Sequence, residues 1–204
     1  MKTIQACRVI LVAAGCVLVS GLFAADQPAA PPMTPEEQAM MQKWQAFATP
    51  GDAHQRLATR AGTWDANIET WEKPGAPPQT STGTSTMTMI MDGRYLFEEA
   101  KGSFMGQPFM GQGTIGYDNM KKKYVWTWVD TMGTGVMTSE GTYNPGTKTT
   151  TYRGQGPDVM AGKYVPMRTI VKDTGPDTYT MEMYGPGPDG KEFKSMRIDY
   201  TRRK

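Results

Sequence analysis

From residue 63 to the C-terminus, polar and apolar residues alternate with a period of two, and turn residues interrupt the alternation at short intervals. Such alternation is typical of strands with one buried face, and pairs such as Asp92-Gly93 are typical of tight turns. The pattern predicts ten strands, at residues 63–72, 82–91, 95–101, 108–117, 123–131, 135–143, 147–154, 165–172, 178–184 and 193–201. A long antiparallel sheet tends to curl, and closure into a barrel removes its edges. We therefore expect an all-β fold, an antiparallel up-and-down β-barrel of about ten strands within residues 62–204.

Two short helices are predicted in front of the barrel, within residues 34–61. Residues 34–37, Thr-Pro-Glu-Glu, form a helix start, with the threonine as N-cap and a glutamate three positions later. Thr49-Pro50 marks the start of a second helix, which Gly62 is expected to end.

The first 25 residues have the layout of a cleavable secretory signal peptide. Lys2 and Arg8 precede an uncharged apolar run, residues 9–23, and Ala24-Ala25 supplies the small residues of a cleavage site. The run is too short for a comfortable membrane span. We therefore expect a bacterial protein that is periplasmic or secreted.

Removal of this signal would change the chemistry of the chain. Both cysteines, Cys7 and Cys16, would leave with it, so the mature protein would have no disulfide and no thiol. The 22 basic residues would become 20, equal to the 20 acidic residues, which leaves no electrostatic reason to bind nucleic acid or an anionic membrane. Residues 26–33, rich in Pro and Ala, would form a disordered linker. A lipoprotein anchored through Cys16 is the less favoured alternative.

The predicted core is rich in methionine and aromatic residues. After residue 25 the chain has 16 Met and 19 aromatic residues, but only 13 Val, Ile and Leu together. Unbranched Met side chains adapt to irregular shapes, so this composition suits either a Met-tolerant core or a Met-rich binding surface. The thioethers of Met87, Met89 and Met91 form a row on one strand face rather than converging, and we predict neither a metal site nor a cofactor.

Strand parity places Tyr124, Trp126, Trp128 and Asp130 on one face of a single strand. Two large rings on one face are typical of a barrel interior or of a recognition surface. Arg94-Tyr95 directly follows a turn and is therefore expected at a barrel rim. These residues form a candidate ligand-binding site, with plain core filling by the tryptophans as the alternative.

Charged residues on the strands extend this candidate site. Centring a hairpin on Gly175 places Arg168 opposite Glu182, and Glu98 shares a strand face with Arg94. If these charges point inward, they form a polar floor that can orient a ligand. The favoured interpretation is that they point outward as ordinary cross-strand pairs.

Other chemical signatures are weak, and no catalytic residue is predicted. Residues 111–116 match the dinucleotide pattern G-x-G-x-x-G, but a turn and another strand follow instead of the required helix. His54 is the single histidine, too few for a zinc site, and no nucleophile elbow accompanies it. We expect His54 to pack against the barrel or to bond a turn, with haem ligation as a remote alternative.

The head of the first predicted strand, Gly62-Thr63-Trp64, is similar to the Gly-x-Trp motif that opens lipocalin-type barrels. In those barrels the tryptophan closes one end and a late arginine packs across it. The resemblance gives the tryptophan's part to Trp64 and the arginine's part to Arg197 or Arg202.

The stretch from His54 to Arg203 resembles a bacterial family known as domain of unknown function 1579. The segments that carry the resemblance are DGRYL at 92–96, GTIGYD at 113–118, YVWTWVD at 124–130 and GKEFK at 190–194. The resemblance implies an antiparallel, lipocalin-like barrel, and it implies no established activity, substrate or catalytic residue.

Three functions remain open from the sequence. The preferred hypothesis is a binding module that holds a small, largely apolar ligand inside the barrel. The alternatives are an enzyme that uses carboxylate or tyrosine acid–base chemistry in the same place, and a structural or partner-binding module of the envelope. A buried carboxylate with a raised pKa beside a cavity would favour the enzyme, and a solid barrel would favour the structural role. The oligomeric state is left open.

Overall fold

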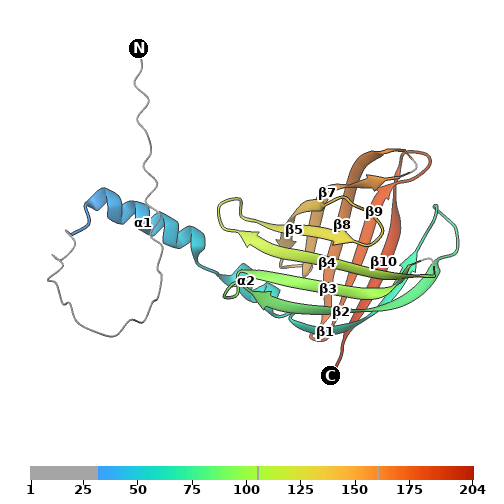
Figure 1. Ribbon diagram of the computed structural model, residues 1–204, viewed down its shortest axis with the longest axis horizontal. Coiled ribbons are helices and arrows are strands. Elements are labelled where there is room, and N and C mark those ends of the chain that lie inside the picture. Colours follow the sequence, from blue (N-terminus) through green and yellow to red (C-terminus); the bar gives the residue numbers. More distant parts are fainter. Residues whose placement is uncertain (1–31, 105, 160) are drawn as a thin grey trace, which may run out of the picture.

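The computed structural model of the chain describes residues 32–104, 106–159 and 161–204 (Figure 1). The predicted signal peptide, 1–25, and most of the predicted linker, 26–33, lie outside the described residues. Within the described part, two helices precede ten strands. They are α1 (Pro35–Ala48), α2 (Asp52–Ala58), β1 (Gly62–Thr70), β2 (Gln79–Ile90), β3 (Tyr95–Phe104), β4 (Gln107–Asp118), β5 (Lys123–Asp130), β6 (Met137–Asn144), β7 (Thr149–Asp158), β8 (Lys163–Gly175), β9 (Thr178–Pro186) and β10 (Glu192–Arg202).

The strands form a closed barrel in which each pairs antiparallel with its neighbours in sequence, and β10 pairs with β1 to complete the ring. The predicted up-and-down barrel of about ten strands, preceded by two helices, is therefore confirmed. Some strands are longer than predicted: β2 begins at Gln79 rather than 82, and β8 at Lys163 rather than 165. The added residues lie at one rim of the barrel, where the sequence has no polar–apolar alternation that would indicate a strand.

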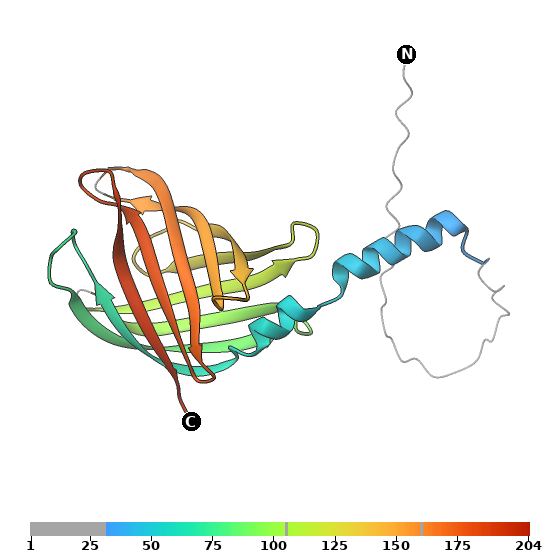
Figure 2. The same cartoon turned by 180° about the vertical axis from the view of Figure 1, so that it is seen from behind.

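Helix α1 projects away from the barrel and has no buried residue (Figures 1 and 2). It begins as predicted, with Thr34 and Glu37 in a reciprocal capping box. Its far end is tied to the β4–β5 turn, because Asn119 Nδ2 donates to the carbonyl oxygens of Phe47 and Thr49, each at 2.9 Å.

Helix α2 covers one end of the barrel and buries Leu57 and His54. It begins at Asp52 with Gly51 as N-cap rather than directly after Thr49-Pro50. Gly62 does not end this helix. It opens β1 at a φ of 130°, and a Cβ there would lie 2.6 Å from Arg202 Nη1, so the position needs a glycine.

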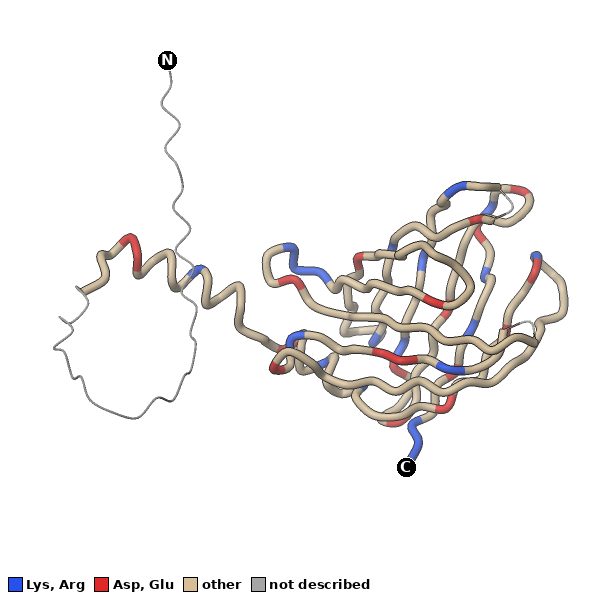
Figure 3. The backbone as a smooth tube through the Cα atoms, in the orientation of Figure 1, with Lys and Arg blue, Asp and Glu red and all other residues tan. Residues whose placement is uncertain are grey.

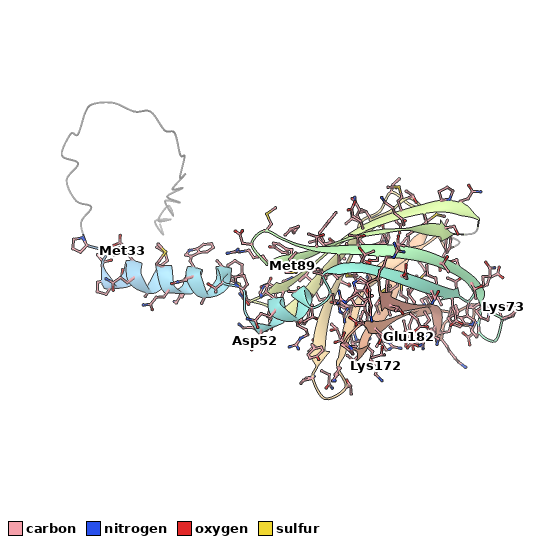
Figure 4. The ribbon with its side chains drawn as sticks, turned by 90° about the horizontal axis from the view of Figure 1, so that it is seen from below. Met33, Asp52, Lys73, Met89, Lys172 and Glu182 are labelled. Carbon is pink, nitrogen blue, oxygen red and sulfur yellow. The ribbon has the colours of Figure 1, made fainter. Side chains whose placement is uncertain are left out.

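The two ends of the barrel differ. We call the end under α2 the closed end and the opposite end, with the β1–β2 loop, the open end. Figure 4 shows Asp52 of α2 and Lys73 of the β1–β2 loop at these opposite ends. The side chains buried toward the closed end include Leu57, Trp64, Met87, Leu96, Ile115, Tyr124 and Tyr179.

Charged residues lie mostly near turns and strand ends, with a few along the strands (Figure 3). Within the described ranges, no helix is long and apolar enough to cross a membrane.

Candidate functional site

The barrel interior is hollow toward the open end, where a cavity of about 310 Å³ lies between the strands. We call this cavity the cup. Most of the residues that line it are of three kinds. Small residues include Ala66, Ser81, Gly83, Ser85, Ala100, Gly102 and Gly154; methionines are Met132, Met137, Met167, Met181, Met183 and Met196; aromatic residues are Phe104, Phe109, Trp126, Trp128, Tyr152 and Tyr200.

Small residues on β2 and β3 make room for the cup. Gly83 and Gly102 are paired across these strands, and a Cβ on Gly83 would lie 2.8 Å from the Lys101 carbonyl oxygen. The two backbones therefore pack at a separation that a larger residue would disturb. The methionines of the cup other than the exposed Met132 are partly buried, and their side chains are flexible, so this part of the wall can adapt to an irregular shape.

Trp126 and Trp128 form an aromatic wall of the cup, as strand parity placed them on one face. Their rings meet edge to face at 6.0 Å between centroids, and Trp126 meets Tyr152 at 5.7 Å. The rings lie over Gly111 and Gly113 of β4, where a Cβ would collide with them. These two glycines belong to the G-x-G-x-x-G match, so sheet packing against tryptophan accounts for them.

The two indole N–H groups of this wall differ in their hydrogen bonding. Trp128 Nε1 donates to Asp130 Oδ2 at 2.8 Å near the open end. Trp126 Nε1 is buried and has no hydrogen-bond partner among the described residues. A buried donor without a partner carries a free-energy cost.

The cup has an acidic residue deep inside it. Glu98 of β3 is only 5% exposed, and Ser85 Oγ donates to its Oε1 at 2.7 Å. Burial raises the pKa of Glu98 above its ordinary value, and the hydrogen bond from Ser85 and the charge of Arg60 oppose that rise only in part. The favoured expectation that Glu98 points outward is wrong. Its neighbour Glu99 is the one that faces solvent, because adjacent strand residues point to opposite faces.

A second layer of polar groups lies between Glu98 and the closed end. Arg60, which follows α2, is paired with Asp173 at 2.7 Å and lies over the ring of Tyr179 at 4.6 Å. Burial lowers the pKa of Arg60, but Asp173 raises it above its ordinary value overall, so the guanidinium stays charged. Burial also raises the pKa values of Tyr152 and Tyr200, which therefore remain protonated phenols in the cup.

The structure separates the predicted site residues into two groups. Trp126, Trp128 and Asp130 line the cup. Tyr124 shares their inward face but lies buried at the closed end, where its hydroxyl accepts from Arg56 Nε of α2 at 3.1 Å. Arg94-Tyr95 lies at the β2–β3 turn, also at the closed end, and Tyr95 packs on Gly116 of the outer face.

Arg168 and Glu182 also lie away from the cup, on the outer face. The predicted register is wrong: Arg168 pairs with Tyr184, because the hairpin turns at Pro176-Asp177 and β8 has an irregularity near Gly175. Arg168 stacks on the Tyr184 ring at 4.0 Å and bonds Glu192 at 2.6 Å.

Glu182, labelled in Figure 4, belongs to a surface network. It accepts from the Tyr184 hydroxyl at 2.8 Å, from Lys194 at 3.2 Å and from Arg197 at 3.3 Å. The bonds from Lys194 and Arg197 join β10 to β9, and they are half-exposed cross-strand pairs of the kind expected on an outward face.

Trp64 closes the barrel at the α2 end and is 2% exposed. Of the two arginines considered, Arg202 stacks on it at 4.1 Å and donates to the Ala61 and Thr59 carbonyl oxygens. Arg197 instead points outward and bonds Asp199. Trp64 Nε1 donates to the Arg60 carbonyl oxygen at 2.9 Å, so Trp64 also ties the segment that follows α2 to the barrel.

The contacts of His54 stabilise the fold. Its Nδ1 accepts from the Gly51 amide at 3.0 Å, and its ring packs edge to face against Tyr117. Burial lowers its pKa, so the imidazole is neutral near pH 7. No group of three or more His, Cys, Asp or Glu that could hold a metal ion occurs among the described residues.

Sequence reasoning missed most of the cup. Glu98 was considered but assigned outward, and Ser85 and the paired glycines were not singled out. The available signal was parity: Glu98 alternates with Leu96 and Ala100, which are inward-facing residues of an apolar strand face.

Comparisons with known proteins place this fold among solved structures. The S-type phycobiliprotein lyase CPES from Guillardia theta aligns with a TM-score of 0.54 at 10% identity, covering 79% of this chain and 97% of that one. The crystal structure of Rv2717c from M. tuberculosis aligns with a TM-score of 0.55 at 11% identity, covering 76% and 100%. At such identities the likeness is one of fold alone.

A comparison with curated proteins finds no match. The model of the family described as "Protein of unknown function (DUF1579)" matches residues 49–202, which include α2 and the whole barrel. The chain therefore belongs to the DUF1579 family.

Proposed function

We propose that the protein binds a small, largely apolar molecule in the cup. The observation that carries the proposal is the cavity of about 310 Å³ in a barrel that is otherwise well packed. Ligand pockets typically have volumes of roughly 300–1,000 Å³, apolar and aromatic walls, and a few polar groups. The cup combines such walls with a few polar groups, among them Glu98 and Asp130. A purely structural barrel would have no need of this hollow.

The experiment is a titration with N-phenyl-1-naphthylamine, an apolar fluorophore that is uncharged at neutral pH. We expect its emission to rise on binding to the wild type, and the emission of Trp126 and Trp128 to change at the same time. The Ala100→Phe variant should lose binding, because the added ring would project into the cup.

The matched control is Val129→Phe, which adds a ring at a 41% exposed position on the outer face of β5. It should bind the fluorophore as the wild type does. Absence of binding to the wild type, or unchanged binding to Ala100→Phe, would overturn the proposal.

A second candidate function is acid–base catalysis in the cup, and Glu98 is the observation that favours it. A buried carboxyl with a raised pKa can act as a general acid near neutral pH. The fold is compatible with an enzyme, since one similar structure is named as a lyase. Mass spectrometry of small-molecule mixtures incubated with wild type and Glu98→Gln tests it: a compound consumed only by the wild type supports catalysis, and recovery of all compounds unchanged excludes it for that mixture.

We also propose that the mature protein is exported to the periplasm or beyond, after cleavage near Ala24-Ala25. The basic, apolar and small-residue segments of residues 1–25 support this. N-terminal sequencing of exported material should give a start at Ala25 or Asp26. A lipid-modified start at Cys16 would replace this proposal with the lipoprotein alternative.

A further inference from the structure

The charges that face the cup are unusual for a site that takes apolar molecules. Glu98, Asp130 and Lys101 are the charged residues among those that line it. Lys101 is exposed and lies at the outward parity of β3, opposite to its neighbours Ala100 and Gly102. The inward-facing charges of the described wall are therefore both acidic, one deep and one near the open end.

Glu98 is only partly satisfied by the protein. Its Oε1 accepts from Ser85, whereas none of the hydrogen bonds between described residues uses its Oε2. The nearby cation Arg60 is already paired with Asp173 at 2.7 Å, and no salt bridge within the described ranges includes Glu98. A buried carboxylate without a paired cation is costly, so one oxygen remains ready to accept a bond from a ligand.

The walls around Glu98 also suit a positive charge. Trp126, Trp128, Tyr152 and Tyr200 present aromatic rings to the cup. The faces of such rings attract ammonium groups, most strongly where water is excluded. Carboxylate and aromatic rings together therefore offset the loss of hydration that a buried cation suffers.

We propose that the ligand of the cup is an apolar molecule with one basic nitrogen, whose ammonium group donates to Glu98 while its apolar part contacts the tryptophans and methionines. This inference rests on the proposed function, since it names the chemical class of the ligand in the same cup. The inference also excludes apolar molecules that carry a carboxylate, a ligand class that apolar barrels commonly suggest. A ligand carboxylate would lie beside Glu98, and two carboxyl groups at that distance can bind only by sharing a proton.

Three probes of equal chain length test the inference: octylamine, octan-1-ol and octanoate, each titrated against the full protein while tryptophan fluorescence is followed. At neutral pH we expect octylamine to bind about 10- to 100-fold more tightly than the other two, as a charge-assisted hydrogen bond would provide. Octanoate should bind most weakly. Equal or tighter binding of octan-1-ol or octanoate would overturn the inference and leave the proposed function standing.

Variants at two adjacent positions separate a bond to Glu98 from general attraction to acidic protein. Glu98→Gln should bind octylamine no better than octan-1-ol, with binding of octan-1-ol kept. Glu99→Gln removes an exposed carboxylate from the next residue of β3 and should keep the wild-type preference. Persistence of the amine preference in Glu98→Gln, or its loss in Glu99→Gln, would overturn the assignment.

The Ser85→Ala variant keeps the test decisive if Glu98→Gln does not fold, because it alters the same site and retains the carboxyl group. It should still prefer octylamine, and loss of that preference in a folded variant would count against Glu98 as the partner. If the wild type binds none of the three probes and no N-phenyl-1-naphthylamine, the proposed function itself fails. Binding of that fluorophore together with no amine preference overturns the ligand class alone.

Discussion

The two halves of the barrel interior are built by the same strands but filled in opposite ways. Along β2 the inward positions run from Ser81, Gly83 and Ser85 to Met87 and Met89, from small at the open end to large at the closed end. On β3 the inward positions from Gly102 through Ala100 and Glu98 to the fully buried Leu96 show the same gradient, and Phe104 lies at the rim of the open end beyond them.

The closed half owes its packing to a partner that the open half lacks. Helix α2 contributes Leu57 to the core, and Arg56 lies over the ring of Tyr143 at 3.8 Å. Trp64 stacks with Tyr179 edge to face, at 4.8 Å, under Arg202. Stability is therefore concentrated at the α2 end, and the other end is left free to hold a cavity.

The largest expected effect is at the closed end. Trp64→Ala should lower the free energy of unfolding by about 3–5 kcal/mol, as for truncation of a large buried aromatic side chain. Denaturant unfolding followed by circular dichroism measures it. The control is Trp44→Ala, which truncates a tryptophan 62% exposed on α1 and should change the free energy by less than about 0.5 kcal/mol. Similar values for both variants would contradict the dense packing assigned to the closed half.

A smaller loss is expected behind the aromatic wall of the open half. In Gly113→Ala the new Cβ would lie 2.8 Å from Trp128 Cε3, 2.9 Å from Trp126 Nε1 and 3.0 Å from the Thr127 carbonyl oxygen. Overpacking of this kind typically costs about 1–3 kcal/mol, and the displaced rings should shift the fluorescence maximum. Gly185→Ala, with no heavy atom within 4 Å of its Cβ, should be neutral or slightly stabilising. An unchanged fluorescence maximum in Gly113→Ala would show that the rings do not rest on β4.

The period of two was sufficient to predict the strands, their order and the shared face of Trp126 and Trp128, because these are local properties of consecutive residues. Trp64 was identified in another way, by the resemblance of Gly62-Thr63-Trp64 to the Gly-x-Trp motif of lipocalin-type barrels. Parity tells which residues share a face, and the apolar residues on a face are what indicate the interior. For Glu98 that indication was mixed, because it shares a face with the apolar Leu96 and Ala100 but also with Arg94, and it was assigned outward.

The positions of Arg94-Tyr95 and Arg168 failed for two different physical reasons. Each strand end lies at one of two rims, and only the docking of α2 decides which rim is closed. Arg94-Tyr95 was placed correctly near a rim, but that rim is the one under α2. The Arg168 pairing failed because the turn lies at Pro176-Asp177 rather than at Gly175 and the register shifts again between Asp173 and Gly175, so that the pairing moves by two residues in all. Sequence composition does not distinguish turns that differ so little.

Glu98 should make the free energy of unfolding depend on pH. Burial raises the pKa of Glu98 in the folded state above its ordinary value of 4.5, while Ser85 and Arg60 lower it and the phenols of Tyr152 and Tyr200 stay neutral. The folded state therefore holds the proton more tightly than the unfolded chain does. The stabilisation that protonated Glu98 gives the folded state is complete below pH 4.5, and it is lost as the pH rises through the folded-state pKa of Glu98.

In Glu98→Gln this loss should vanish, so the free energy of unfolding should fall less steeply with rising pH above 4.5 than in the wild type. Ser85→Ala should shift the loss to higher pH, because it removes a hydrogen bond that favours the carboxylate. Urea titrations from pH 4 to pH 9 measure both effects. Identical pH profiles for wild type and Glu98→Gln would mean that Glu98 is solvated in the folded protein. Water would then fill the open half of the barrel as far as Ser85.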